Sequence, residues 1–175
     1  METEDPLGLA SGTVRVVQYD ARWPAVFEAE SARLREACGA LPVRIEHVGS
    51  TSVPGLAAKP VLDILAGHPA AASPFDYVKP FARAGYVHRG DRGIPGHQFF
   101  RRGEPRAYHI HLVELDGRLW RQYITFRDHL RTNAEAARRY ADLKRALAEQ
   151  FPHDRPSYID AKSAFVEAIL QEMHR

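Results

Sequence analysis

The sequence is poor in the features that mark several large classes of protein. Cys38 is the single cysteine among 175 residues, which excludes an internal disulfide and a zinc site built from cysteines. No apolar run approaches the roughly 20 residues that a membrane-spanning helix needs. Residues 1–12 lack the basic and then apolar pattern of an export signal. We therefore expect a cytoplasmic protein without a membrane partner.

Excess charge of one sign is also missing. The 24 lysines and arginines against 22 acidic residues give a formal net charge of +2, which does not favour a nucleic-acid partner. The arginines nevertheless gather in residues 83–106 and 118–145, which leaves room for a local anion site. The glycine-lysine-serine or threonine sequence of a P-loop is absent. Any phosphate site must therefore be built in another way.

Apolar periodicity predicts an α+β fold, with a small mixed or antiparallel sheet, flanking helices and a helical C-terminal lobe. We expect residues 1–12 to form a flexible tail and residues 13–175 to form one domain, with an α/β part over 13–118 and a helical part over 119–175. The expected strands cover residues 13–18, 41–48, 61–66, 86–88, 98–102 and 107–114. The expected helices cover residues 24–39, 74–85, a stretch from 119 onward, 134–151 with Asn133 as its cap, and 158–173.

Asp63 does not fit an ordinary strand. Side chains alternate along a strand, so Asp63 shares a face with the apolar Val61 and Leu65. A carboxylate seldom stays in apolar surroundings without a charged partner, hydrogen bonds or a metal. The strand over residues 61–66 therefore predicts a functional site.

The same stretch carries a family signature. The segments HVGSTSVPGL at residues 47–56 and KPVLDI at residues 59–64 resemble the signature of the GrpB-like family, a branch of the nucleotidyltransferase superfamily. The resemblance extends to VQYD at residues 17–20, HIHLV at 109–113 and FRDHLR at 126–131, and covers about nine tenths of the chain. It implies that Gly49 and Ser50 hold nucleotide phosphates and that Asp63 is a metal carboxylate. It also implies magnesium-assisted attack on a nucleoside triphosphate. This sequence departs from the superfamily pattern at Leu65, where a second acidic residue is usual.

Other side chains are candidates to complete the site. His109 and His111 share one face of a strand about 7 Å apart, and with Asp63 they would suit manganese, zinc or iron better than magnesium. His47 could join them, whereas Glu114 faces away. We expect Lys59 to pair with Asp63 or a triphosphate, and we expect Asp63, Lys59 and His111 to act in catalysis. The expected phosphate contacts are Gly49, Ser50, Thr51, Ser52, Arg101 and Arg121, and the expected metal ligands are Asp63, His109 and His111.

Three functions remain open from the sequence. The leading one is a nucleotidyltransferase-like enzyme that uses a nucleoside triphosphate, a divalent metal (Mg or Mn, with Zn as a further option) and a small acceptor. The second is an inactive module that binds a nucleotide or another phosphorylated small molecule, which the missing acid at residue 65 favours. The third is a histidine-metal enzyme of another reaction type, acting on a small amino or carboxyl substrate in the same cleft.

Overall fold

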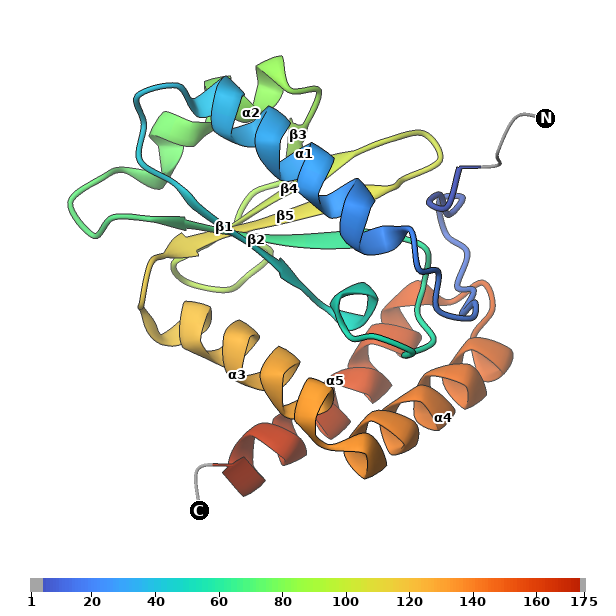
Figure 1. Ribbon diagram of the computed structural model, residues 1–175. Helices are drawn as coiled ribbons and strands as arrows, with labels where there is room; N and C mark the ends of the chain where they lie inside the picture. Colours follow the sequence, from blue (N-terminus) through green and yellow to red (C-terminus); the bar gives the residue numbers. More distant parts are fainter. Residues whose placement is uncertain (1–4, 174–175) are drawn as a thin grey trace.

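The computed structural model describes residues 5–173, which form a five-stranded sheet with helices on both sides (Figure 1). The strand order is β1-β2-β5-β4-β3. Strands β2 and β5 run parallel, and every other neighbouring pair is antiparallel. The strands are β1 (Arg44–Val48), β2 (Leu62–His68), β3 (Val87–His88), β4 (His97–Arg102) and β5 (Tyr108–Glu114). The predicted α+β class with a mixed sheet is confirmed.

Two helices cover one face of this sheet. Helix α1 (Trp23–Cys38) begins with Pro24, whose fixed backbone suits a first helical turn. Its buried residues Trp23, Phe27 and Leu34 pack against the sheet, as does Phe81 of α2 (Val78–Arg83). A short 3-10 helix, η2 (Pro74–Tyr77), precedes α2, so the helix predicted over residues 74–85 is divided in two. In Figure 1, α1 and α2 both lie above the strands.

The opposite face carries the helical part of the chain. The helices are α3 (Arg118–Thr132), α4 (Ala134–Gln150) and α5 (Arg155–Met173). Asn133 caps α4 as predicted, because its side-chain oxygen accepts from the Ala136 amide at 2.9 Å. Figure 1 shows the three helices gathered below the sheet. No helix among residues 5–173 is both long enough and apolar enough to span a membrane.

Strand β2 is central because helices pack against both of its faces. Leu62, Ile64 and Ala66 are buried in the core under α1, whereas Leu65 packs against Trp120 of α3. Asp63 shares the face of Leu65, as the alternation predicted. The fold therefore holds a carboxylate between the sheet and the helical part.

The first residues of the chain differ from our expectation. We predicted a flexible tail over residues 1–12, yet Leu7 and Leu9 are buried at 7% and 4% exposure. The Gly8 amide donates to the Pro60 carbonyl at 2.8 Å, and Leu9 forms a bridge with Arg106. Residues 1–4 lie outside the described part of the chain. The strand predicted over residues 13–18 is reduced to one bridge, between Val17 and Ala58.

We expect Leu9→Ala to lower the free energy of unfolding by about 2 kcal/mol, since it removes a buried side chain and leaves a cavity. Ser11→Ala is the control, because Ser11 is exposed two residues further on. Urea unfolding of both variants checks this. Equal stability of Leu9→Ala and wild type would mean that this segment does not pack as described.

Candidate active site

A cavity of about 340 Å³ lies at the end of β2 where the carboxylate emerges. Its walls come from the turn after β1, from strands β4 and β5, from the loop between β3 and β4, and from helices α3, α4 and α5. The volume is at the small end of the range for small-molecule sites. The cavity is lined by Gly49, Ser50, Thr51, Ala58, Lys59, Val61, Asp63, Arg92, Ile94, His97, Phe99, His109, His111, Tyr123, Tyr140, Lys144, Arg155, Tyr158, Ile159 and Lys162.

Asp63 is held by the two histidines of the neighbouring strand. The parallel register places Asp63 opposite His109. The Asp63 Oδ1 atom lies 3.3 Å from His109 Nδ1 and 3.1 Å from His111 Nε2. Because an ionised carboxylate only accepts, both ring nitrogens donate to it. Burial alone would raise the pKa of the Asp63 carboxyl, but these two hydrogen bonds and the histidine charge hold it well below its ordinary value.

Gly49 lets the backbone approach this carboxylate. Its φ of 72° lies in the left-handed region, and a β-carbon added there would stand 2.6 Å from Asp63 Oδ2. Any larger residue would therefore displace Asp63. The following residues, Ser50 and Thr51, belong to the short 3-10 turn η1 (Ser50–Ser52) and line the cavity. A glycine and two hydroxyl residues thus border the exposed side of the carboxylate.

A hydrogen-bond chain extends from His111 away from Asp63. His111 Nδ1 lies 3.0 Å from His97 Nε2 and 3.1 Å from the Tyr123 hydroxyl. His97 Nδ1 lies 3.2 Å from the Asp91 carbonyl and donates to it. Burial and the neighbouring His111 lower the pKa of His97 to about 4, so His97 is neutral at pH 7 and its Nε2 accepts. His97 Nε2 and the Tyr123 hydroxyl are thus both within hydrogen-bond distance of the His111 ring nitrogen that faces away from Asp63.

His109 keeps one ring nitrogen free. Its side chain is buried, and its Nε2 atom has no hydrogen-bond partner, although the residue lines the cavity. Burial lowers the pKa of His109 to about 4, despite the hydrogen bond to Asp63, so the free nitrogen carries a lone pair at neutral pH. This nitrogen can accept a hydrogen bond from a bound hydroxyl group or bind a metal.

The predicted metal ligands meet, but in a different arrangement from the one expected. Asp63, His109 and His111 lie together, yet the histidine nitrogens nearest to the carboxylate are bonded to it rather than arranged around an open centre. No group of three or more His, Cys, Asp or Glu residues with ligand geometry is found in the described residues. At the carboxylate itself, the donor left for a metal is the remaining Asp63 oxygen. One carboxylate oxygen fits an ion held mainly by substrate oxygens and water, as magnesium usually is.

Cations dominate the rest of the lining. Burial and the nearby Lys162 lower the pKa of the Lys59 ammonium to about 7. Lys144 is 2% exposed and donates to the Ala57 carbonyl at 2.5 Å. Burial and neighbouring lysines lower the pKa of Lys144 well below its usual value. With Arg92 and Arg155, five basic side chains among the described residues line the cavity, and Asp63 is the one carboxylate found there among them. Such a lining favours an anionic ligand.

Some sequence-predicted residues lie outside this cavity. The Ser52 hydroxyl donates to the Gly49 carbonyl at 2.5 Å and does not line the cavity. Arg101 shares the strand face of His109 but is not in the lining, and Arg121 is exposed on α3. His47 faces away from Asp63, where it stacks on Phe27 with ring centres 4.7 Å apart. It contacts the site only through its Nε2, 2.9 Å from the Thr51 hydroxyl.

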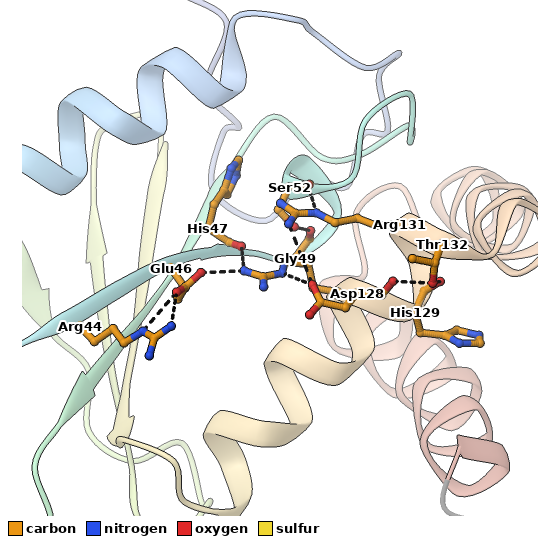
Figure 2. Close-up of polar contacts among 10 residues, drawn as sticks. Arg44, Glu46, His47, Gly49, Ser52, Asp128, His129, Arg131 and Thr132 are labelled. Atoms are coloured by element: carbon orange, nitrogen blue, oxygen red, sulfur yellow. Dashed lines mark hydrogen bonds and ion pairs between the residues drawn. The ribbon is translucent and has the colours of Figure 1, made fainter.

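Two arginines of α3, Arg127 and Arg131, hold the turn that carries Gly49. Arg127 bonds the Glu46 carboxylate at 2.9 Å and the His47 carbonyl at 3.1 Å, just before Gly49. Arg131 Nε bonds the Ser52 carbonyl at 2.9 Å, just after it. Figure 2 shows Arg131 of α3 bonded to Ser52, which in turn bonds Gly49. Helical spacing within α3 could not reveal these partners, because they lie about 80 residues earlier in the chain.

Sequence reasoning missed the contributions of α4 and α5. Tyr140 and Lys144 lie one turn apart on α4, and both face the cavity. On α5 the lining residues are Arg155, Tyr158, Ile159 and Lys162, at the spacing of one helix face. The spacing is visible in the sequence, but nothing there indicates that this face turns toward Asp63.

We expect Gly49→Ala to disturb the site beyond the strain of its backbone. Gly55→Ala is the control, since Gly55 has a similar φ of 78° but no atom within 4 Å of an added β-carbon. Thermal or urea unfolding should show Gly49→Ala to be less stable than Gly55→Ala by about 1–3 kcal/mol, because only Gly49→Ala forces Asp63 to move. Equal losses would show that Asp63 does not depend on Gly49.

Comparison with known proteins identifies the family. The sequence profile described as GrpB protein matches residues 13–172. A UPF0157 protein of Streptomyces coelicolor is 42% identical over 86% of this chain and 79% of its own length. The glutamate-rich protein GrpB of Alkalihalophilus pseudofirmus is 33% identical over 95% of this chain and 99% of its own. A protein of Mycolicibacterium paratuberculosis named dephospho-CoA kinase is 29% identical, but the match spans 44% of its length.

Solved structures agree on the fold. The crystal structure of GrpB from Enterococcus faecalis has a TM-score of 0.82 at 33% identity and covers 90% of this chain and 96% of that one. The Cid1 poly(U) polymerase bound to Mg 3'-dATP has a TM-score of 0.53 at 10% identity, covering 77% of this chain and 43% of that one. This likeness concerns the fold alone. The chain therefore belongs to the GrpB (UPF0157) family and has a nucleotidyltransferase-like fold.

Proposed function

We propose that this protein binds a nucleoside triphosphate, or a related phosphorylated small molecule, in the Asp63 cavity and transfers a nucleotidyl group from it to a small acceptor. The observation that carries this is the isolated carboxylate beside a glycine-serine turn, in a cavity with five basic side chains. Such a cavity favours a polyanion, and the carboxylate favours a metal-bound one. The fold shared with a polymerase whose structure holds Mg 3'-dATP supports the same choice.

The residues divide into phosphate-binding and metal-binding groups. Ser50 and Thr51 offer hydroxyls at the turn, and Lys59 and Lys144 offer amino groups from other parts of the cavity lining. A divalent ion, Mg or Mn, would be held by Asp63 together with substrate oxygens. When bound, it would neutralise charge that builds up on the phosphoryl oxygens. His109 Nε2 is free to accept a hydrogen bond from an acceptor hydroxyl group, while His111 fixes the position of Asp63.

An inactive binding module is the second candidate, and one observation favours it. Leu65, which stands where the superfamily has a second acid, is fully buried among Val48, Val113 and Trp120. An acidic residue cannot be accommodated there without leaving a charge in an apolar cluster. The third candidate, a histidine-metal enzyme, has less support because both histidines donate to Asp63.

The direct test combines binding with turnover. We expect ATP or another nucleoside triphosphate with magnesium to stabilise the protein, by about 2.7 kcal/mol at one hundred times the dissociation constant. Asp63→Asn should remove the magnesium-dependent part of this shift, whereas Asp76→Asn, a change at an exposed position of η2, should not. Release of pyrophosphate with candidate acceptors separates the enzyme from the inactive module. A triphosphate that gives no shift with any divalent metal would contradict both.

Binding should also take up protons. At pH 8 the Lys59 ammonium, with a pKa of about 7, is mostly deprotonated. A bound polyanion raises this pKa, so the complex gains protons, and the affinity falls as the pH rises above about 7. Calorimetry at pH 8 in Hepes and in Tris measures the uptake.

Lys59→Met should reduce that uptake, and Lys79→Met, at an exposed position on α2, should leave it unchanged. The uptake that remains in Lys59→Met is expected from Lys144, whose pKa is also lowered by burial. Identical heats in the two buffers for the wild type would show that no depressed lysine contacts the ligand.

A further inference from the structure

The face of α5 that borders the cavity carries more binding groups than a metal-bound triphosphate needs. Arg155, Tyr158 and Lys162 lie on this face, and Arg92 of the β3–β4 loop lines the same cavity. The triphosphate is already offered Ser50 and Thr51 at the turn and Lys59 in the loop before β2, so these four side chains are further binding groups. A metal ion cancels part of the charge of a triphosphate, so the turn side of the cavity can satisfy that ligand with fewer cations.

Two polar atoms on α5 are buried without any partner. Tyr158 is 0% exposed, and its hydroxyl has no hydrogen bond, nor has the buried Nε of Arg155. The ring of Tyr158 lies near two lysine side chains, with Lys59 Nζ at 4.9 Å and Lys162 Nζ at 5.9 Å from its centre. Burial raises the pKa of Tyr158 to about 12, so the hydroxyl remains a donor. Buried donors of this kind normally have a partner, and here none is supplied by the described residues.

The charges around Arg155 also favour an anionic ligand. Burial and the nearby Arg92 and Arg101 lower the pKa of Arg155, so the guanidinium lies among like charges. Asp63, the one carboxylate of the lining, is already bonded to His109 and His111. An arginine, a lysine and a tyrosine of α5 therefore line the same cavity, and neither Arg155 Nε nor the Tyr158 hydroxyl has a hydrogen-bond partner among the described residues. A phosphate group matches this set, because it accepts several hydrogen bonds and carries about two negative charges.

We infer that Arg92, Arg155, Tyr158 and Lys162 form a second anion subsite, and that it binds a phosphate group carried by the acceptor. This inference rests on the proposed function, since the turn side of the cavity is taken to hold the nucleotide. It narrows the acceptor to a phosphorylated small molecule. It requires no further metal, because the subsite contains donors only.

Inorganic phosphate is the probe. We expect it to bind the wild-type protein without divalent metal and in the presence of EDTA, with an affinity that Arg155→Gln and Arg92→Gln each lower roughly tenfold. Arg89→Gln is the matched control, since Arg89 is an exposed arginine of the same loop that does not line the cavity. Tyr158→Phe should weaken phosphate binding without loss of stability, because the hydroxyl it removes has no partner in the folded protein.

The two proposals can fail separately. Asp63→Asn should keep phosphate binding while it loses the magnesium-dependent triphosphate shift. Phosphate should also still bind when the magnesium triphosphate is saturating, and calorimetry of the complex measures this. Failure of the wild type to bind phosphate, or full competition between phosphate and the triphosphate, would overturn the second subsite. Neither result would decide whether the triphosphate site exists, because the magnesium-dependent shift and its loss in Asp63→Asn test that site separately.

Discussion

The pairing of β2 with β5 is the constraint on which the site depends. It is the one parallel contact in the sheet, and it sets Asp63 directly beside His109. Two ring nitrogens can then donate to the carboxylate and keep it ionised although it is partly buried. The absence of a side chain at Gly49 allows the carboxylate to take that position. A change in register of one residue would turn Asp63 into the core under α1.

The helical part completes the site rather than merely covering the sheet. Arg127 and Arg131 of α3 bind backbone carbonyls on the two sides of the turn that carries Gly49. Lys144 of α4 binds the Ala57 carbonyl in the loop that leads to β2. Each of these cations stabilises a segment that borders the cavity, so the position of the helices and the shape of the site are linked. Mutations on α3 would therefore alter ligand binding without touching the ligand.

The local features of this arrangement could be predicted from the sequence. The alternation of apolar and polar residues identified the face of Asp63 and the shared face of His109 and His111, because a strand has a period of two. The contributions of Arg155 and Lys162 could not be predicted, since they depend on how α5 packs against α3 and α4 and so comes to line the cavity around Asp63. The same holds for Leu9, whose burial depends on partners near Pro60 and Arg106.

The expected metal site shows the limit of such reasoning. The three predicted ligands do meet, but hydrogen bonds from His109 and His111 to Asp63 replace the arrangement around an ion that spacing alone suggested. The spacing of residues in the sequence predicts which side chains lie close together. Whether a histidine ring nitrogen donates a hydrogen bond or coordinates a metal depends on whether that nitrogen is protonated. The result is a carboxylate with one oxygen free for a metal, in contact with a histidine that has one nitrogen free.

The most direct test of the account is to place a paramagnetic ion in the site. Manganese with a triphosphate that cannot be cleaved should broaden the imidazole resonances of His109 and His111 by nuclear magnetic resonance. The resonances of His68, at the far end of β2, should keep their width. The broadening should require the triphosphate and should vanish in Asp63→Asn. Two results would contradict the assignment of Asp63 as the residue that holds a metal-bound nucleotide. One is equal broadening with and without the triphosphate, and the other is unchanged line widths of His109 and His111.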